Sequence, residues 1–264
     1  MHVVCSVLLV LAHVVVGKRG LAWPWFNENS VLDPERLVSS QVVWMYNWET
    51  WRPSKTQNLN WMGTQRCLDC DSSPINQLQA RAADQGWNTV LTLNEPDVMG
   101  VSPSQAAAWY IQYINPLNIK KAAPAVTSSQ ALGQGLDWLN QFFSCCVGSC
   151  FVDYINIHWY GASFNDFQAH VEATHLKFPN LPIIISEFAL QSPATQVDQE
   201  AFMKQAVPYL DNTPFVEYYA FFIASSPTLF AYNDPAGTAF AGNASTLYDD
   251  FGNPSPLGSF YVSL

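Results

Sequence analysis

The sequence predicts an α/β protein built as a single (β/α)8 barrel, the TIM barrel, and three observations support this fold class. Short apolar runs recur about every 30 residues from the third one onward, with helical patterns between them, as in a parallel sheet. The chain has 264 residues, 49% of them hydrophobic and 12% charged, which suits one domain with a full core. No Gly-rich phosphate loop opens an expected helix, which disfavours the alternative, a doubly wound open sheet.

Eight segments are expected to be strands, because each is a short run of apolar or β-branched residues bounded by turn residues. The fourth shows the pattern: it begins at Asn88 and ends near Asn94, since Pro96 cannot continue a ladder. In chain order the expected strands are residues 21–23, 41–46, 59–62, 88–93, 121–126, 154–158, 182–186 and 216–222.

Segments with helical periodicity fill most intervals between these strands. Ser-Pro pairs at 73–74 and 102–103 open two helices, because serine caps a helix and proline is favoured at its first position. Gly86 and Pro116 end them. The expected helices are residues 73–86, 102–116, 132–143, 164–178 and 196–210. The interval between the second and third strands is short, so the second helix is expected to be reduced or replaced by a loop.

The N-terminus is expected to be a secretory signal peptide, residues 1–17, followed by a catalytic domain, residues 18–264. Its apolar run, residues 3–16, is shorter than the roughly 20 residues of a membrane span, which disfavours the alternative of an anchor. Lys18 and Arg19 form a dibasic pair that offers further trimming to 19. A secreted protein, extracellular or in the cell wall and free of the membrane once the signal is removed, is therefore expected.

The amino-acid composition limits the classes of partner that the protein is expected to bind. The net charge is -10 and there are only 11 Lys and Arg residues, which argues against nucleic acid and anionic membranes, because both require clustered positive charge. The chain also holds 10 Trp, 11 Tyr and 16 Phe, and such an aromatic surplus suits a cleft that stacks on flat neutral rings. A monomer is expected.

Cysteines of a secreted chain are expected in disulfides. Removal of the signal would leave five, an odd number, so at least one is unpaired or bridges two chains; the alternative is a zinc site at Cys67-x-x-Cys70, and the pairing stays open. Asn243-Ala244-Ser245 is an N-glycosylation sequon. The five cysteines are Cys67, Cys70, Cys145, Cys146 and Cys150.

Two acids follow strands and form the candidate active site, because a barrel builds its site at the C-terminal ends of its strands. Glu95 ends the fourth strand and Glu187 the seventh, three βα units apart, so they are expected on opposing sides of the barrel mouth. Two carboxylates across an aromatic cleft are what glycosidic bond cleavage requires. The alternative is that these acids are only turn residues.

Several sequence motifs support this hypothesis, because they resemble motifs of a known enzyme family. Asn94-Glu95-Pro96 and Ser186-Glu187-Phe188 resemble the acid motifs of clan A glycoside hydrolases. More closely, the chain resembles the Asl1-like group, glycoside hydrolase family 128, over essentially its whole mature length. The stretches that carry this resemblance are residues 20–23, 93–97, 123–126, 153–160, 182–188 and 257–261.

The resemblance implies a β-1,3-glucan hydrolase, often secreted and fungal, that acts with retention and needs no metal or organic cofactor. Glu95 would be the acid/base, Glu187 the nucleophile, and Asn94 a hydrogen-bonding partner of the sugar 2-hydroxyl. His158 and Tyr160 would hold Glu187 or the sugar, although His158 alone is also compatible with an ordinary buried histidine. The other proposed substrate-binding residues, each of which is alternatively core, are Trp23, Tyr46, Trp48, Trp61, Trp159 and Phe221.

The mechanism that this implies sets the charge state of the two acids. Glu187 is expected to be ionised, and Glu95 to have a raised pKa in an aromatic environment. Endo action is favoured, with exo action left open. Two other functions stay open: a non-hydrolysing β-glucan-binding or cell-wall protein, and a hydrolase of β-1,4-glucan or mannan on the same barrel.

Overall fold

The computed structural model describes residues 17–264. The expected signal peptide, apart from Gly17, lies outside the described residues, as does Cys5. Among residues 17–264, no helix combines the length and the apolar character that crossing a bilayer would require.

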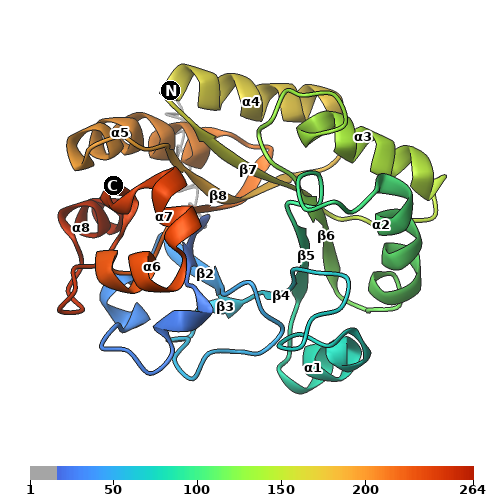
Figure 1. Cartoon of the computed structure of the whole chain (residues 1–264), viewed down its shortest axis with the longest axis horizontal. Helices are drawn as coiled ribbons and strands as arrows, with labels where there is room; N and C mark the ends of the chain where they lie inside the picture. The colour runs from blue at the N-terminus through green and yellow to red at the C-terminus, as the bar shows by residue number, and fades with distance from the viewer. Residues whose placement is uncertain (1–16) are drawn as a thin grey trace, which may run out of the picture.

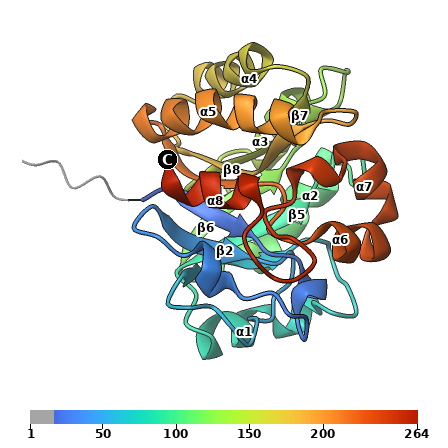
Figure 2. The same ribbon diagram turned by 90° about the vertical axis from the view of Figure 1, so that its left-hand side faces the viewer.

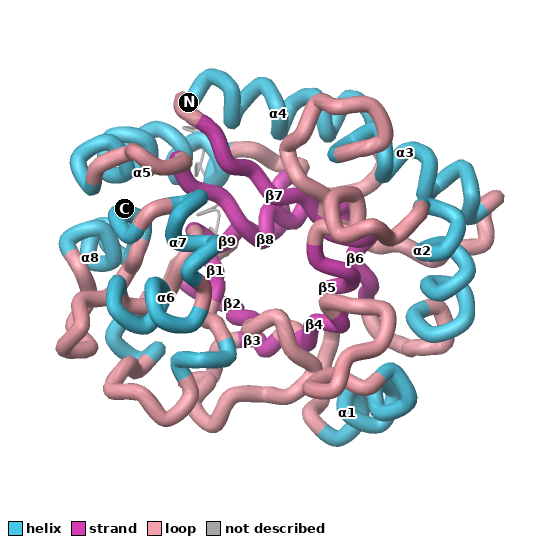
Figure 3. The backbone as a smooth tube through the Cα atoms, in the orientation of Figure 1, coloured by secondary structure: helices cyan, strands magenta, loops and turns pink. Residues whose placement is uncertain are grey.

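Parallel strands form the ring at the centre of the molecule (Figures 1 and 3). They pair in the order β3-β2-β1-β9-β8-β7 in one sheet and β4-β5-β6 in the other. The strands are β1 (Arg19–Ala22), β2 (Val42–Tyr46), β3 (Asn60–Trp61), β4 (Gly63–Gln65), β5 (Thr89–Asn94), β6 (Lys120–Ala125), β7 (Ile155–Gly161), β8 (Ile183–Leu190) and β9 (Val216–Phe221).

Two links join these sheets into one closed barrel. β3 and β4 are successive pieces of a single strand, separated by Met62, so its first part pairs with β2 and its second with β5. On the other side, bridges Ala122↔Tyr154 and Val126↔Ile157 connect β6 to β7. Counting β3 and β4 as one strand gives eight, and the predicted (β/α)8 barrel is confirmed.

Helices surround the ring (Figures 1 and 2). They are α1 (Leu78–Asp84), α2 (Pro103–Trp109) continuing into the π-helical turn η4 (Tyr110–Ile114), α3 (Gly135–Cys146), α4 (Phe164–Lys177), α5 (Gln196–Asn212), α6 (Pro227–Asn233), α7 (Pro235–Ala241) and α8 (Pro256–Ser263). Residues 47–59, between β2 and β3, contain no helix, so the expectation of a reduced second helix is correct.

Local sequence explains where the helices begin. Ser102 accepts a hydrogen bond from the backbone of Gln105 and Pro103 takes the first helical position, so α2 starts where the Ser-Pro pair predicted. Thr195 and Asp198 form a capping box at the start of α5. β8 is buried over its whole length, because a parallel barrel strand has core on one face and helices on the other.

Three strands run further than their sequence predicts. The third continues to Gln65, β7 to Gly161 and β8 to Leu190. Tyr160 and Glu187 therefore project from within strands rather than from the loops behind them, which holds them more firmly. Segment 225–242, which follows the last expected strand, holds α6 and α7, which Figures 1 and 2 place over one end of the barrel.

Candidate active site

A cleft of about 840 Å3 opens at the C-terminal ends of the strands, and both predicted acids line it. Four more of the predicted or strand-tip residues are in its wall: Asn94, Trp48, Tyr160 and Phe222. The acids come from β8 and from the residue directly after β5. The ring of strands has thus brought together positions 92 residues apart in the sequence.

Glu95 stands at a backbone position that few residues other than glycine adopt. Its φ is +46°, and that of Leu93 is +31°. Backbone hydrogen bonds hold this turn: the Glu95 N–H donates to Ala125 and the Asn94 N–H to Arg66, each at 2.8 Å. Positive φ in ordinary residues costs of order 1–3 kcal/mol and is concentrated at functional sites, where the surroundings enforce it. The turn aims the Glu95 carboxylate, whose side chain is 26% exposed, into the cleft.

Glu187 is held by neutral donors. Trp48 donates its indole N–H to Oε1 at 2.7 Å, and the Tyr160 hydroxyl donates to Oε2 at 2.7 Å. Burial and the nearby Glu187 charge raise the pKa of Tyr160 well above its usual value, so this hydroxyl keeps its proton. Tyr46 packs beneath, with its ring 4.6 Å from Trp48 and its hydroxyl on the Ser186 carbonyl. These contacts fix both oxygens of the nucleophile candidate.

His158 lies between the two acids. Its Nδ1 is 2.9 Å from Oε1 of Glu95, and its Nε2 is 3.4 Å from Oε1 of Glu187. One oxygen of each carboxylate and one imidazole nitrogen lie within 4.8 Å of one another. On its far side, Nε2 is 3.0 Å from the Ser186 hydroxyl. The expectation that His158 holds Glu187 is therefore incomplete, because its shorter contact is to Glu95.

The pKa of Glu95 is shifted in the opposite direction to the one expected from the sequence. Burial raises the pKa of Glu95, but the hydrogen bond and charge of His158 outweigh it, and the net shift is downward. Burial raises the pKa of Glu187 above its usual value, against the donors that lower it. Burial lowers the pKa of His158, yet the charges of Glu187 and Glu95 raise it overall. The expected raised pKa of Glu95 is wrong for the unliganded site, because a histidine from β7 pairs with it.

Five of the proposed substrate-binding side chains lie in the core rather than in the cleft. Trp159 is 3% exposed and packs outside the barrel against Phe167 and Phe202 of α4 and α5. Trp159 faces the helices because successive strand residues face opposite sides of the sheet. The stacking role of all five is corrected to a structural one, because each side chain is at most 4% exposed. The residues concerned are Trp23, Tyr46, Trp61, Trp159 and Phe221.

Other apolar side chains replace them along the cleft. Trp25 is 49% exposed, Phe240 50% and Met99 72%, and all three line the cleft. Trp25 lies in the turn η1 (Trp25–Asn27) after β1, and Phe240 lies on α7. Trp25 lies two residues beyond the end of the first expected strand, whereas nothing in the local sequence marks Phe240 as a cleft residue.

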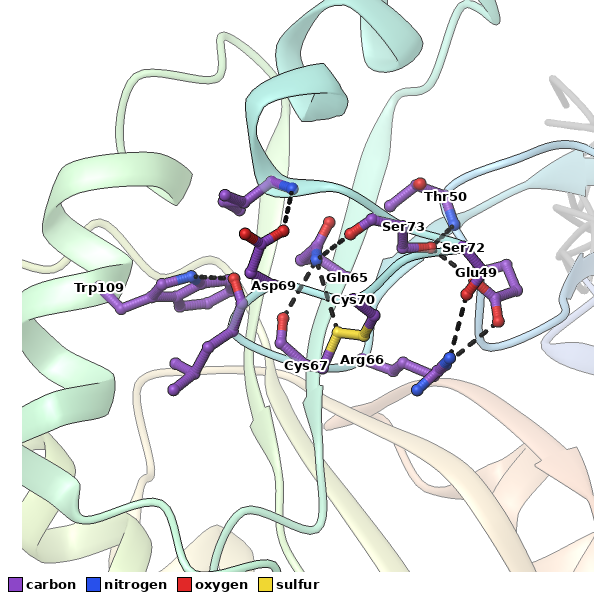
Figure 4. The surroundings of a disulfide bond; sticks show 12 residues. Glu49, Thr50, Gln65, Arg66, Cys67, Asp69, Cys70, Ser72, Ser73 and Trp109 are labelled. Carbon is purple, nitrogen blue, oxygen red and sulfur yellow. Dashed lines mark hydrogen bonds and ion pairs between the residues drawn. A yellow bond between two sulfur atoms is a disulfide. The ribbon is translucent and has the colours of Figure 1, made fainter.

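The loop that the Cys67–Cys70 disulfide closes is shown in Figure 4. Cys67 and Leu68 of this loop line the cleft. Cys67 and Cys70 are bonded to each other, so the zinc alternative for this pair is wrong. Before the loop, Arg66 donates to buried Glu49 at 3.2 Å, and Ser73 donates to the same carboxylate at 2.6 Å. Glu49 therefore anchors the base of the loop and orients Arg66, a cleft residue that the sequence did not reveal.

The remaining described cysteines lie away from the cleft. Cys146 and Cys150 form the second disulfide, at the end of α3. Cys145 is exposed and free among the cysteines that the structure describes. Asn243 is exposed in the turn η5 (Asn243–Ser245), and its glycosylation remains a prediction.

The cluster of Glu95, His158 and Glu187 also has the composition of a metal site. Its donor atoms, however, are already engaged by protein. Both His158 nitrogens have partners within 3.0 Å, and both Glu187 oxygens accept from Trp48 or Tyr160. The arrangement fits a pair of carboxylates held by hydrogen bonds better than a set of ligands converging on an ion.

Comparison with known proteins agrees with this site. The sequence profile described as "Glycosyl hydrolase catalytic core" matches residues 20–261. Alkali-sensitive linkage protein 1 of Schizosaccharomyces pombe is 30% identical over 258 residues, which are 94% of this chain and 45% of that protein. The chain thus spans less than half the length of this relative.

Solved structures with this fold include two glucanases of family 128. A subgroup IV endo-β-1,3-glucanase from Lentinula edodes is 48% identical, with a TM-score of 0.89 over 93% of this chain and 99% of the other. A subgroup III curdlan-specific exo-β-1,3-glucanase from Blastomyces gilchristii is 26% identical, with a TM-score of 0.75 over 94% and 98%. The chain therefore belongs to the glycosyl hydrolase catalytic core family and, within it, to glycoside hydrolase family 128.

Proposed function

We propose that the protein is a secreted endo-β-1,3-glucanase that cleaves with retention of configuration. The observation that carries this proposal is the pair of glutamates, whose nearest oxygens lie within 4.8 Å across the cleft. Retaining glycosidases separate their carboxyl groups by about 5 to 5.5 Å, whereas inverting enzymes leave about 6.5 to 9.5 Å for a water molecule. The 48% identical Lentinula edodes protein, an endo-β-1,3-glucanase, supports both the substrate and the mode of attack.

Each acid has surroundings that suit its role. Glu187 has a donor on each oxygen, from Trp48 and Tyr160, so its lone pairs are oriented, and the two donors offset part of the rise in pKa that burial causes. It would attack the anomeric carbon. Glu95 is more exposed, at the cleft surface, where it would protonate the leaving oxygen and then deprotonate water. Asn94 precedes it in the cleft wall and would bind the sugar 2-hydroxyl.

The shape of the cleft suits a neutral polysaccharide. Trp25, Met99 and Phe240 expose apolar surface along it, and such surface packs on the flat faces of sugar rings. Arg66, anchored by Glu49, offers donors to sugar hydroxyls in the same wall. An extracellular or cell-wall location follows from the signal peptide that the sequence predicts and remains part of the proposal.

Replacement of the nucleophile tests the assignment. Glu187→Gln keeps the size of the side chain but removes its nucleophilicity, so hydrolysis of linear β-1,3-glucan should fall by about a thousandfold or more. Binding of β-1,3-oligosaccharides should survive. New reducing ends measure the first result and calorimetry the second. The matched control is Glu172→Gln, an exposed glutamate on α4, which should keep the parent rate.

Product analysis separates the finer alternatives. Early products of several lengths from a defined oligosaccharide series indicate endo action, and a single short product indicates exo action. Proton NMR of the first-formed anomer reports retention directly. Binding of β-1,3-glucan by the parent protein without new reducing ends would instead identify a glucan-binding protein and refute the proposed activity.

A further inference from the structure

A chain of hydrogen bonds leads from the core to Glu95. Asn156, Ser186 and His158 are all buried. The Ser186 hydroxyl donates to the Asn156 side-chain oxygen at 2.9 Å and lies 3.0 Å from Nε2 of His158. The other imidazole nitrogen, Nδ1, is 2.9 Å from Oε1 of Glu95. The chain joins neighbouring strands β7 and β8 to the residue after β5.

The order of donors in this chain fixes the tautomer of His158. A serine hydroxyl has one proton, and Ser186 gives it to Asn156. The Ser186 oxygen must therefore accept from His158, so Nε2 carries a proton. Glu187 lies 3.4 Å from the same nitrogen and favours the same arrangement. When His158 is neutral, its Nδ1 is thus a bare acceptor that faces a carboxylate.

Two bare acceptors do not remain at 2.9 Å, so a proton must lie between Nδ1 and Oε1. We propose that His158 and Glu95 share this single proton, and that His158, its tautomer fixed by Ser186 and Asn156, is a positioning residue that supplies the acid with its proton. This inference rests on the proposed glycosidase function. The proton resides on His158, which agrees with the raised pKa of His158 and the lowered pKa of Glu95.

Protons and charges balance in both steps of retaining hydrolysis when His158 and Glu95 share this proton. In the first, the proton passes from Nδ1 to Glu95 and on to the leaving oxygen, as the glycosidic bond breaks and Glu187 bonds to the anomeric carbon. In the second, Glu95 takes a proton from water, the hydroxide displaces Glu187, and the proton returns to the pair. The three groups together have one negative charge before and after each step. A buried site favours such constancy.

The charged groups that face the pair favour keeping this proton, and the tyrosines that face it carry no charge. Glu187 of β8 and Asp97, which follows β5, both contribute negative charge that raises the pKa of His158. Tyr46 of β2 and Tyr160 of β7 have pKa values well above 10, because of burial and the charge of Glu187, so they are neutral at working pH. Loss of the last proton would leave neutral His158 between two unneutralised carboxylates.

The pH profile of His158→Asn tests the inference. Asparagine places an amide where Nδ1 was but cannot hold a titrating proton, so the proton that the acid needs should be lost at a lower pH than it is from the pair in the parent. The basic limb of kcat/KM on β-1,3-glucan should move to lower pH by about one unit or more. A merely structural role would lower activity equally at every pH. An unmoved basic limb in an active variant would overturn the inference while leaving the proposed function intact.

Tyr160→Phe is the matched comparison on the other acid. It removes a donor from Glu187, which should raise the pKa of Glu187 and move the acidic limb to higher pH, with the basic limb unchanged. Imidazole 15N NMR of the parent protein gives a readout that needs no turnover. Nε2 of His158 should stay protonated throughout the titration while only Nδ1 changes. A proton that leaves Nε2 first would also overturn the inference, and absence of glucan hydrolysis in the parent would refute the proposed function instead.

Discussion

At the scale of single residues, His170 limits acid stability. This α4 histidine is buried, and neither of its ring nitrogens has a hydrogen-bond partner. Burial lowers its pKa from 6.5 to about 4. As pH falls below 6.5, the unfolded chain binds a proton that the native state does not bind until about pH 4. Stability attributable to His170 is therefore complete above pH 6.5 and falls by about 3 kcal/mol on the way to pH 4.

Substitution of His170 should remove this part of the pH dependence. His170→Leu fills a similar volume with no titrating group, so its free energy of unfolding should fall less between pH 7.5 and pH 4.5 than that of the parent, by roughly 2 to 3 kcal/mol. Urea denaturation of both proteins at pH 7.5 and pH 4.5 measures this change in the free energy of unfolding. The comparison at pH 7.5 isolates any packing defect. Equal pH dependence in the two proteins would show that the pKa of His170 is the same in the native and unfolded states, so that the native protein binds this proton near pH 6.5.

The same scale shows how far sequence alone defines the site. Glu95, Glu187 and Asn94 were found because carboxylates at strand ends are uncommon and the barrel brings strand ends together. The aromatic residues were not, because their role depends on strand register. Tyr160 faces the cleft while Trp159, one position earlier, faces the helices.

The protonation states of Glu95 and Glu187 could not be predicted from the local sequence. The pKa of Glu95 is lowered by a residue 63 positions away, and the tautomer of that residue depends on a contact between strands. Burial and pairing of this kind follow from the closed ring rather than from any motif. A histidine at the end of the sixth expected strand could have indicated an interaction with the site, but not with which acid.

At the scale of elements, α7 adds a wall to the cleft. Phe240 projects from it, half-exposed, with its ring 5.2 Å from that of Tyr160. Phe240→Ala should raise KM for long β-1,3-oligosaccharides about fivefold with little change in kcat, because a ring at this place in the cleft would contact the sugar equally in the ground and transition states. That corresponds to about 1 kcal/mol of lost apolar contact. Initial-rate kinetics over a range of chain lengths measures it.

Phe251→Ala, between α7 and α8, is the matched control for the Phe240 substitution. Phe251 is 87% exposed and does not line the cleft, so its loss should leave KM unchanged. A similar KM for the parent and Phe240→Ala would mean that α7 shapes the end of the barrel without contacting glucan.

Long elements were predictable, whereas short ones were not. The eight strands and the longer helices lie within a few residues of their expected places, because each must bury a continuous apolar face. α6 and α7 have seven residues each and, unlike α1 and α2, are not followed by a further strand that would have marked the interval as helical. Their Ser226-Pro227 and Asp234-Pro235 starts resemble the Ser-Pro starts of other helices, and this was the signal available for them.

At the scale of the whole molecule, Arg19 ties the first strand to the last helix. It is buried at the start of β1, bonds to Asp211 of α5 at 2.7 Å, and donates to the Tyr261 and Leu264 carbonyls at 2.7 and 2.8 Å. Tyr219 of β9 donates to the same Asp211. The ring of strands is therefore closed near its N-terminal end by a charged group as well as by backbone pairing.

Trimming of the dibasic pair would remove this connection. A chain that begins at Gly20 should be less stable than one that begins at Lys18 by about 2 to 3 kcal/mol, because partly buried Asp211 and two carbonyls lose their partner. Arg19→Met should show a loss of similar size, whereas Lys18→Met, at the neighbouring and more exposed position, should show a smaller one. Chemical denaturation compares all four proteins at one pH. Equal stability of the two shortened chains would mean that α8 stays docked on the barrel without Arg19, and that trimming after residue 19 is compatible with the fold.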